Sequence, residues 1–279
     1  MVKVVKSDGR EEAFDRNKVR RTITRLGATS GLADEISLSI ENEAYQGIKT
    51  KTILAKIKEA LRKRKDVAPR RDLRSALGAM SPKPDFENYV QLVLRAHEYT
   101  VYPNRVIQGF CVSHEIDGVA EKDGVRYYLE VKNHKSAHSY TPFNVTLSAK
   151  AKLDDIKEGY KRGINNERFD KVLIVCNTRF TEHARKYAEC MGLEHIGWNI
   201  PRGGGIDSLI EEKDLYPATM IESLTRSELG KLSQRNILTL KQLTQVTDRV
   251  DNISVSRMSE IIDVAGKILE KPREKHKID

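Results

Sequence analysis

Hydrophobic and polar positions alternate in the middle of the chain, on both sides of a strong turn signal. Residues 114–132 read HEIDGVAEKDGVRYYLEVK and contain the pair Asp123-Gly124. Such pairs are favoured in two-residue hairpin turns, because both positions of the turn need a positive φ. The pattern therefore predicts a β-hairpin in which Lys122 faces Val125 across the turn.

Continuing this register along both arms brings two carboxylates and an amine to one face. Asp117 falls opposite Glu130, about 5 Å away at Cβ, and Lys132 lies two residues beyond Glu130 on the same face. Adjacent carboxylates repel each other unless positive charge lies between them. A divalent cation, Mg²⁺ or Mn²⁺, with Lys132 beside it meets that need. The opposite, apolar face is expected to carry Tyr127, Leu129 and Val131.

Strand and helix patterns alternate on either side of the hairpin. We expect a strand over Val106–Val112 and a helix over Asn144–Ile164, with Leu147, Ala151, Leu153 and Ile156 facing inward. The apolar run Lys171–Asn177 is typical of a strand that is buried on both faces in a parallel sheet. This succession predicts a mixed central sheet flanked by helices.

Further helices are expected before and after this central region. The N-terminal pattern indicates two short strands and three helices, Arg16–Leu26 after the N-cap Asp15, Ala33–Tyr45 and Thr50–Lys63. The C-terminal pattern indicates three helices, Thr225–Gln234, Thr239–Gln245 and Ser256–Leu269. Prolines at Ser81–Pro84 and the flexible glycines Gly203–Gly205 mark breaks. We expect an α/β multi-domain protein divided at residues 1–82, 83–210 and 211–279.

Composition adds a preference for a polyanionic partner. The 279 residues carry a formal net charge of +9, and residues 56–74 alone contain nine lysines and arginines. DNA would suit this charge, although a well-solvated lysine-rich surface is the simpler alternative. Cys111 and Cys176 lie in apolar runs without metal-ligand spacing and are expected to be reduced core residues. No apolar stretch reaches the roughly 18 residues of a membrane span, so we expect a cytoplasmic protein with no membrane partner.

The acids and the lysine of the hairpin resemble the active site of the PD-(D/E)xK nucleases. Asp117 is followed by Glu130-Val131-Lys132, and the chain adds FENYV upstream and KVLIVCNTRFTEHARKYAECMGLEHIGW downstream. Together these segments are similar to the Mrr-type restriction endonucleases over roughly residues 83 to 200. Ile116 stands where the family has proline.

The resemblance implies a role for each residue of this motif. Asp117, Glu130 and the Val131 carbonyl would hold the divalent metal, and Lys132 would orient the attacking water or share the developing charge. Glu87, in the first turn of an upstream helix capped by Asp85, would contact the metal through water; the alternative is that it only complements the helix dipole. Lys150 is a candidate phosphate contact, or a solvated lysine.

The opening of the chain, VVKSDGREEAFDRNKVRRTI, resembles an ATP-cone, a nucleotide-binding regulatory module. The resemblance implies that ATP or dATP binds with its phosphates near the side chains and tight turn of Lys6, Ser7, Gly9, Lys18 and Arg21. Many members carry arginine where this chain has Ser7. The alternative is that these cations are ordinary surface charges.

The C-terminal sequence IESLTRSELGKLSQRNILTLKQLTQV resembles helix-hairpin-helix domains. Asn236 stands where glycine is usual, and asparagine tolerates the left-handed conformation that the turn requires. DNA binding and a helical bundle for docking remain alternatives for this module. The closing segment KPREKHKID is expected to be a solvated basic tail.

These patterns favour a metal-dependent DNA endonuclease that an adenine nucleotide regulates. One alternative is a nucleotide-responsive DNA-binding regulator whose nuclease fold is inactive, and another is a scaffold in which the acids pair with lysines. With one site per chain, cutting both strands would require a homodimer or two visits.

Overall fold

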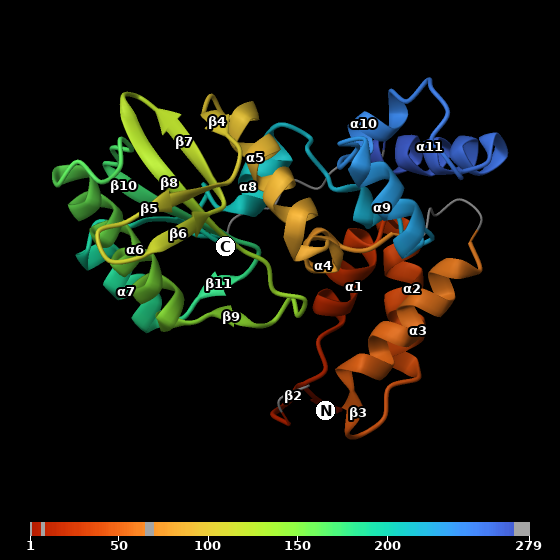
Figure 1. Cartoon of the computed structure of the whole chain (residues 1–279). Helices are drawn as coiled ribbons and strands as arrows, with labels where there is room; N and C mark the ends of the chain where they lie inside the picture. Colours follow the sequence, from red (N-terminus) through yellow and green to blue (C-terminus); the bar gives the residue numbers. More distant parts are fainter. Residues whose placement is uncertain (1, 7–8, 65–69, 271–279) are drawn as a thin grey trace.

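The computed structural model describes residues 2–6, 9–64 and 70–270. Figure 1 shows an N-terminal region, a central region with the large sheet, and a group of C-terminal helices. Ser7 of the expected nucleotide site and the expected basic tail over residues 271–279 lie outside the described residues. No helix of the described ranges is both long and apolar enough to cross a lipid bilayer.

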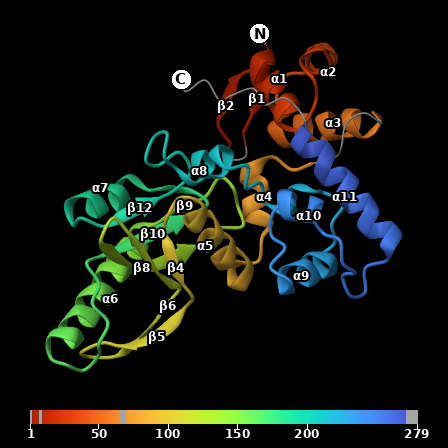
Figure 2. The same ribbon diagram turned by 90° about the horizontal axis from the view of Figure 1, so that it is seen from above.

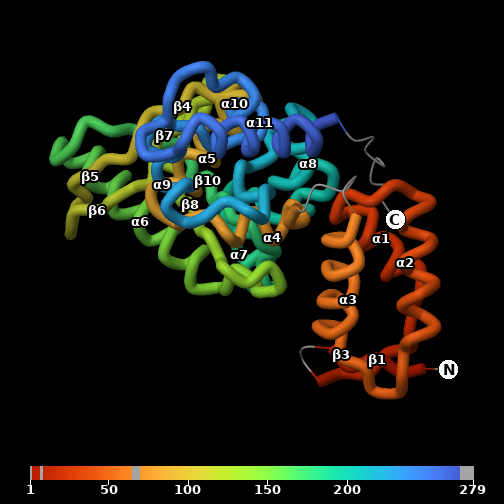
Figure 3. Tube along the Cα trace, turned by 90° about the vertical axis from the view of Figure 1, so that its right-hand side faces the viewer, coloured from red at the N-terminus to blue at the C-terminus, as the bar shows by residue number. Residues whose placement is uncertain are grey.

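The N-terminal region is a small three-stranded sheet with three helices, standing beside the rest of the chain (Figure 3). Its strands have the order β2-β1-β3, and its own apolar core contains Ile23, Ile48 and Ile57. Asp15 caps the first helix as expected, accepting from the backbone N–H groups of Asn17 and Lys18. The elements are β1 (Lys3–Val5), β2 (Glu11–Ala13), α1 (Arg16–Arg25), α2 (Ser30–Asn42), β3 (Ile48–Lys49) and α3 (Thr50–Arg62).

The central region is built on a five-stranded mixed sheet in the order β12-β10-β8-β7-β4. β8, β10 and β12 are parallel, whereas β7 and β4 are antiparallel to their neighbours, which confirms the expected mixed sheet. Its strands are β4 (Thr100–Tyr102), β7 (Gly118–Lys122), β8 (Val125–Lys132), β10 (Lys171–Cys176) and β12 (Glu194–Ile196). Two short pairs flank it, β5 (Arg105–Gln108) with β6 (Ser113–Ile116) and β9 (Tyr140–Thr141) with β11 (Arg179–Phe180).

Helices cover both faces of this sheet (Figures 1 and 2). One apolar layer joins Tyr128 and Ile174 to α6 and α7, and the other joins Leu129 and Val131 to α5 and α8. The helices are α5 (Glu87–Ala96), α6 (Phe143–Lys161), α7 (Glu182–Cys190) and α8 (Ile206–Glu212). Alternate residues of β8 therefore enter opposite layers, as the period of a strand requires.

The predicted hairpin is present with the predicted register. Lys122 pairs with Val125, and Asp123 and Gly124 both have positive φ, as a primed turn demands. The ladder ends with Gly118 opposite Leu129, and the backbone N–H of Asp117 donates to the carbonyl oxygen of Leu129 at 3.0 Å, which holds Asp117 beside this end of the hairpin.

The strand expected over Val106–Val112 is wrong. β5 ends at Gln108, and the chain turns back through Gly109–Val112 to form β6. The side chain of Asp155 on α6 holds this turn, because it accepts from the backbone N–H groups of Cys111 and Val112. Cys111 is consequently exposed, which corrects the expectation of a core residue, whereas Cys176 is buried as expected.

Replacing Asp155 with asparagine should destabilise the protein in a pH-dependent way. Although burial acts in the opposite direction, hydrogen bonds from the Cys111 backbone, His114 and the Val112 backbone lower the pKa of Asp155 from 3.8 to about 2. A carboxylate whose pKa falls on folding stabilises the native state above its unfolded pKa, and this contribution is lost as the pH falls toward the folded pKa. We expect the melting temperatures of the natural and Asp155→Asn proteins to differ near neutral pH and to converge between about pH 4 and 2. A difference that does not change with pH would exclude this ionic anchoring.

Helix α6 buries Leu153 and Ile156 as expected, whereas Leu147 and Ala151, also expected to face inward, are exposed. The other buried residues of the helix are Thr146, Ala149 and Gly159. The Thr146 hydroxyl donates within the helix to the carbonyl oxygen of Phe143, so a polar residue fits the buried stripe.

The C-terminal helices share the core of the central region. Together with α4 (Leu73–Ala79), they pack against α5 and α8 in one apolar cluster. The C-terminal helices are α9 (Arg226–Gln234), α10 (Leu240–Thr244) and α11 (Val255–Glu270). Short helical segments lie at Pro82–Phe86 and Ala218–Met220. The expected C-terminal helices are present, and Asn236 adopts the expected positive φ between α9 and α10.

Two expected local features are absent or altered. Asp85 does not cap α5; its carboxylate accepts instead from the Ser233 hydroxyl of α9 at 2.5 Å. The break at Gly203–Gly205 is not an open linker, because a Cβ on Gly205 would lie 2.6 Å from the backbone nitrogen of Asn199. The domain limits at residues 82 and 210 stay a prediction.

Candidate active site

Asp117 is held rigidly at the junction between β6 and β7. The Gln91 side-chain amide donates to its carbonyl oxygen at 3.1 Å. Its Oδ2 atom accepts from the Val131 backbone N–H at 2.8 Å, and only 8 % of the side chain is exposed. The acid is therefore tied across the hairpin to the strand that carries Glu130.

Glu130 is almost fully buried between two lysines. Its Oε1 atom lies 2.6 Å from Lys132 Nζ, and its Oε2 atom lies 3.0 Å from Lys152 Nζ of α6. The same Lys152 amine donates to the Glu115 carbonyl oxygen at 3.4 Å. A buried carboxylate needs such partners, because unpaired burial of charge is costly.

A third amine meets the other acids of the site. Lys83 Nζ lies 3.0 Å from Glu115 Oε1, 3.2 Å from Glu87 Oε1 and 3.3 Å from Asp117 Oδ1. Hydrogen bonding to Glu115 is the largest cause that raises the pKa of Lys83, so its ammonium form is favoured.

Glu87 reaches the same cluster from the first turn of α5 and is buried. Burial raises the pKa of Glu87, and the negative charge of Asp117 adds to the shift, while Lys83 opposes it. Two carboxylates that share a buried space resist ionising together, so this corner of the site favours an added cation.

The structure brings together all four residues predicted for catalysis, Asp117, Glu130, Lys132 and Glu87, in one neighbourhood linked by these contacts. Sequence reasoning missed Lys83, Glu115 and Lys152. Glu115 lies two residues before Asp117, and strand alternation would have placed it on the same side. Lys150 pairs instead with Asp154 on its own helix.

The donor set suits a hard cation. Carboxylate oxygens from α5, β6 and the β6–β7 junction already surround the Lys83 ammonium, and oxygen is the donor that Mg²⁺ and Mn²⁺ prefer. Within the described ranges, no three imidazole, thiol or carboxylate groups stand at metal-ligand spacing.

The predicted nucleotide-binding cations also lie near one another. Lys6 Nζ and Lys18 Nζ lie 2.7 and 3.2 Å from the same oxygen of Glu12, and hydrogen bonds from these lysines lower the pKa of that carboxyl. Gly9 has a positive φ of 84° and closes the turn beside Lys6. Arg21 lies on α1 and donates to the Asn17 carbonyl oxygen.

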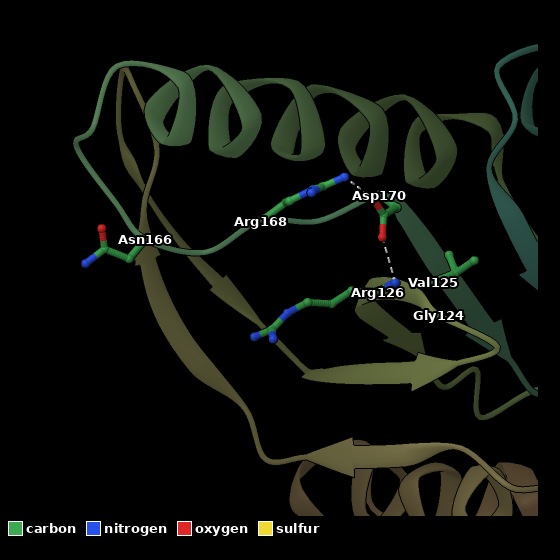
Figure 4. Close-up of a pocket in the computed structure, with 6 residues that line it drawn as sticks. All are labelled: Gly124, Val125, Arg126, Asn166, Arg168 and Asp170. Atoms are coloured by element: carbon green, nitrogen blue, oxygen red, sulfur yellow. Dashed lines mark hydrogen bonds and ion pairs between the residues drawn. The ribbon is translucent and has the colours of Figure 1, made fainter.

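A separate pocket lies at the turn end of the hairpin (Figure 4). Arg126 lies four residues before Glu130, about 13 Å along an extended strand, so this pocket is not part of the acidic site. Its lining residues are Gly124, Val125, Arg126, Asn166, Arg168 and Asp170.

Comparison with known families divides the chain into two matched regions. Residues 2–72 match the ATP cone domain. Residues 77–197 match the Mrr-type catalytic domain, a restriction endonuclease domain. Both agree with the resemblances noted from the sequence.

Two relatives each match close to two thirds of the chain. An uncharacterised protein of Archaeoglobus fulgidus is 32 % identical over 180 residues, which cover 63 % of this chain and 98 % of the relative. A crystal structure of a protein of unknown function is 32 % identical, with a TM-score of 0.58, and the match covers 66 % of this chain and 96 % of that one.

Proposed function

The chain belongs to the Mrr-type restriction endonuclease family and carries an N-terminal ATP-cone domain, and from this premise we propose that it is a metal-dependent DNA endonuclease regulated by an adenine nucleotide. The observation that supports the proposal is a pair of contacts: Asp117 accepts from the Val131 N–H, and Glu130, the residue before Val131, pairs with Lys132. The net charge of +9 supports DNA as the partner.

Asp117, Glu130 and the Val131 carbonyl would hold Mg²⁺ or Mn²⁺ in this proposal. The bound cation would supply a water of lowered pKa and would offset negative charge at the reacting phosphate. Asp117 fits this task because its Oδ1 atom faces the cation position, while its Oδ2 atom is fixed by Val131.

Two lysines, Lys132 and Lys152, would have the remaining roles at the site. Lys132 is 40 % exposed at the mouth of the site, so its ammonium can reach a phosphate oxygen and stabilise the charge that develops there. Lys152 would hold the Glu130 side chain in place from the α6 side. Glu87 would position water next to the cation.

Nicking of supercoiled plasmid tests the proposed activity. We expect the natural protein to nick DNA with Mg²⁺ or Mn²⁺ and not with EDTA, and Glu130→Gln to lose this activity. Equal activity in both proteins would indicate a contaminating nuclease. Nucleotide-dependent DNA binding without nicking by the natural protein would support the regulator with an inactive nuclease fold.

Regulation by ATP or dATP rests on the ATP-cone domain and on its contact with the C-terminal helices. Lys58 of α3 lies 2.9 Å from Glu222, and Arg71 donates to the carbonyl oxygen of Thr219 at 2.8 Å. A nucleotide-induced shift of α3 would therefore reach the region that packs against the nuclease core.

Replacing Lys18 with alanine should weaken ATP binding by about tenfold or more, because a charged hydrogen bond to phosphate is lost. Equilibrium dialysis with labelled ATP measures this change. Lys51→Ala, on the exposed side of α3, is the matched control and should bind normally. Equal affinity in the two variants would remove Lys18 from the nucleotide site.

A further inference from the structure

Lys83 is the one residue among the seven charged groups of the site that touches three of its acids. These groups are Lys83, Glu87, Glu115, Asp117, Glu130, Lys132 and Lys152. The side chains of Glu87 and Asp117 are each only 8 % exposed, whereas that of Lys83 is 56 % exposed. The ammonium therefore covers two buried carboxylates from the solvent side.

The position of Lys83 is set by its neighbours along the chain. The Ser81 hydroxyl donates to the Lys83 carbonyl oxygen at 2.8 Å, and Asp85 accepts from Ser233 of α9. Lys83 has an extended backbone just before α5, and from there its amine reaches Glu87 in the first turn of the helix. The amine is thus presented to the acids by a segment fixed at both ends.

We propose that the Lys83 ammonium holds the Oδ1 atom of Asp117 in the metal-free protein and releases it when the metal binds. This inference rests on the proposed function, because that function makes Asp117 a metal ligand. An ammonium and a divalent cation that both contacted this oxygen would repel each other, so the metal has to displace the amine.

Displacement has two consequences that do not depend on catalysis. The amine competes with the metal, so metal affinity is lower than the acids alone would give. The same amine stabilises the metal-free protein, because without it Glu87 and Asp117 would be left as neighbouring buried acids with one fewer partner. Removing it should therefore tighten metal binding and weaken the metal-free fold.

Calorimetric titration with Mn²⁺ tests this exchange in the full-length protein. We expect Lys83→Met to bind Mn²⁺ about tenfold more tightly than the natural protein, in keeping with the modest strength of partly exposed ion pairs. Lys83→Arg keeps the competing charge and should bind no more tightly than the natural protein. Lys171→Met is the control for the loss of one positive charge, since Lys171 pairs with Glu194 away from the acids.

Thermal melting provides a second readout. Without metal, Lys83→Met should melt at a lower temperature than the natural protein, and saturating Mn²⁺ should raise its melting temperature by more than that of the natural protein. A far-ultraviolet circular dichroism spectrum of Lys83→Met that matches the spectrum of the natural protein shows that the variant is folded.

The outcomes separate this inference from the function on which it rests. Mn²⁺ binding that is unchanged or weaker in folded Lys83→Met overturns the exchange and leaves the nuclease proposal standing. Absence of Mn²⁺ binding in the natural protein and in Lys83→Met alike overturns both. If Lys171→Met bound Mn²⁺ as much more tightly as Lys83→Met does, the gain in affinity would be due to the loss of one positive charge from the protein. That result would also overturn the exchange.

Discussion

Replacing Lys132 with methionine is expected to slow metal-dependent plasmid nicking by about 10²–10³-fold, the usual cost of removing one preorganised charge-stabilising donor. Metal affinity should not fall, because Lys132 is a partner of Glu130 and not a ligand of the cation. Single-turnover nicking with saturating Mn²⁺ separates the two effects.

Lys171→Met is the appropriate comparison for this variant. Lys171 lies at the start of β10, beside Tyr127 in the register, and its ion pair is with Glu194. It should nick DNA at close to the natural rate. If Lys132→Met also retained the natural rate, the amine would have no part in the chemistry.

Replacing Asp117 with asparagine should have the second large effect, on metal binding as well as on nicking. The amide oxygen can still accept from the Val131 N–H, so the hairpin should keep its geometry. The loss of one negative charge should weaken Mn²⁺ binding by about tenfold or more and slow nicking by about 10³-fold.

The same substitution at Asp123 is a matched control on the same hairpin. Asp123 has a φ of 51° in the two-residue turn, a position where asparagine is at least as well suited. Asp123→Asn should therefore fold, bind Mn²⁺ and nick DNA like the natural protein. Normal Mn²⁺ affinity in Asp117→Asn would mean that the cation binds elsewhere.

The hairpin and its register could be predicted from sequence because the information is local. Asp123 and Gly124 specify the turn, and the period of a strand then fixes the partner of every residue in both arms. The cap at Asp15 is equally local, since its side chain accepts from backbone N–H groups within three residues. The predicted position of Asp117 opposite Glu130 follows from the turn and the strand period alone.

The remaining site residues depend on contacts between distant segments. Lys83 reaches Asp117 across 34 residues of chain, and Lys152 reaches Glu130 across 22. Contacts at these separations along the chain produce no periodic pattern in the sequence. Lys83 also stands between two prolines, which predict only a linker. For helix α6 the sequence predicts the burial of Leu153 and Ile156 correctly and that of Leu147 and Ala151 wrongly, because the helix has apolar residues on more than one side.

Crystals of the natural protein soaked with Mn²⁺ and measured at the manganese absorption edge would test the central claim most directly. The account predicts an anomalous peak bound by Asp117 and Glu130, beside Lys132 and with the Lys83 amine withdrawn. Manganese bound only at other residues, with the contacts of Lys83, Lys132 and Lys152 to the acids unchanged, would contradict it.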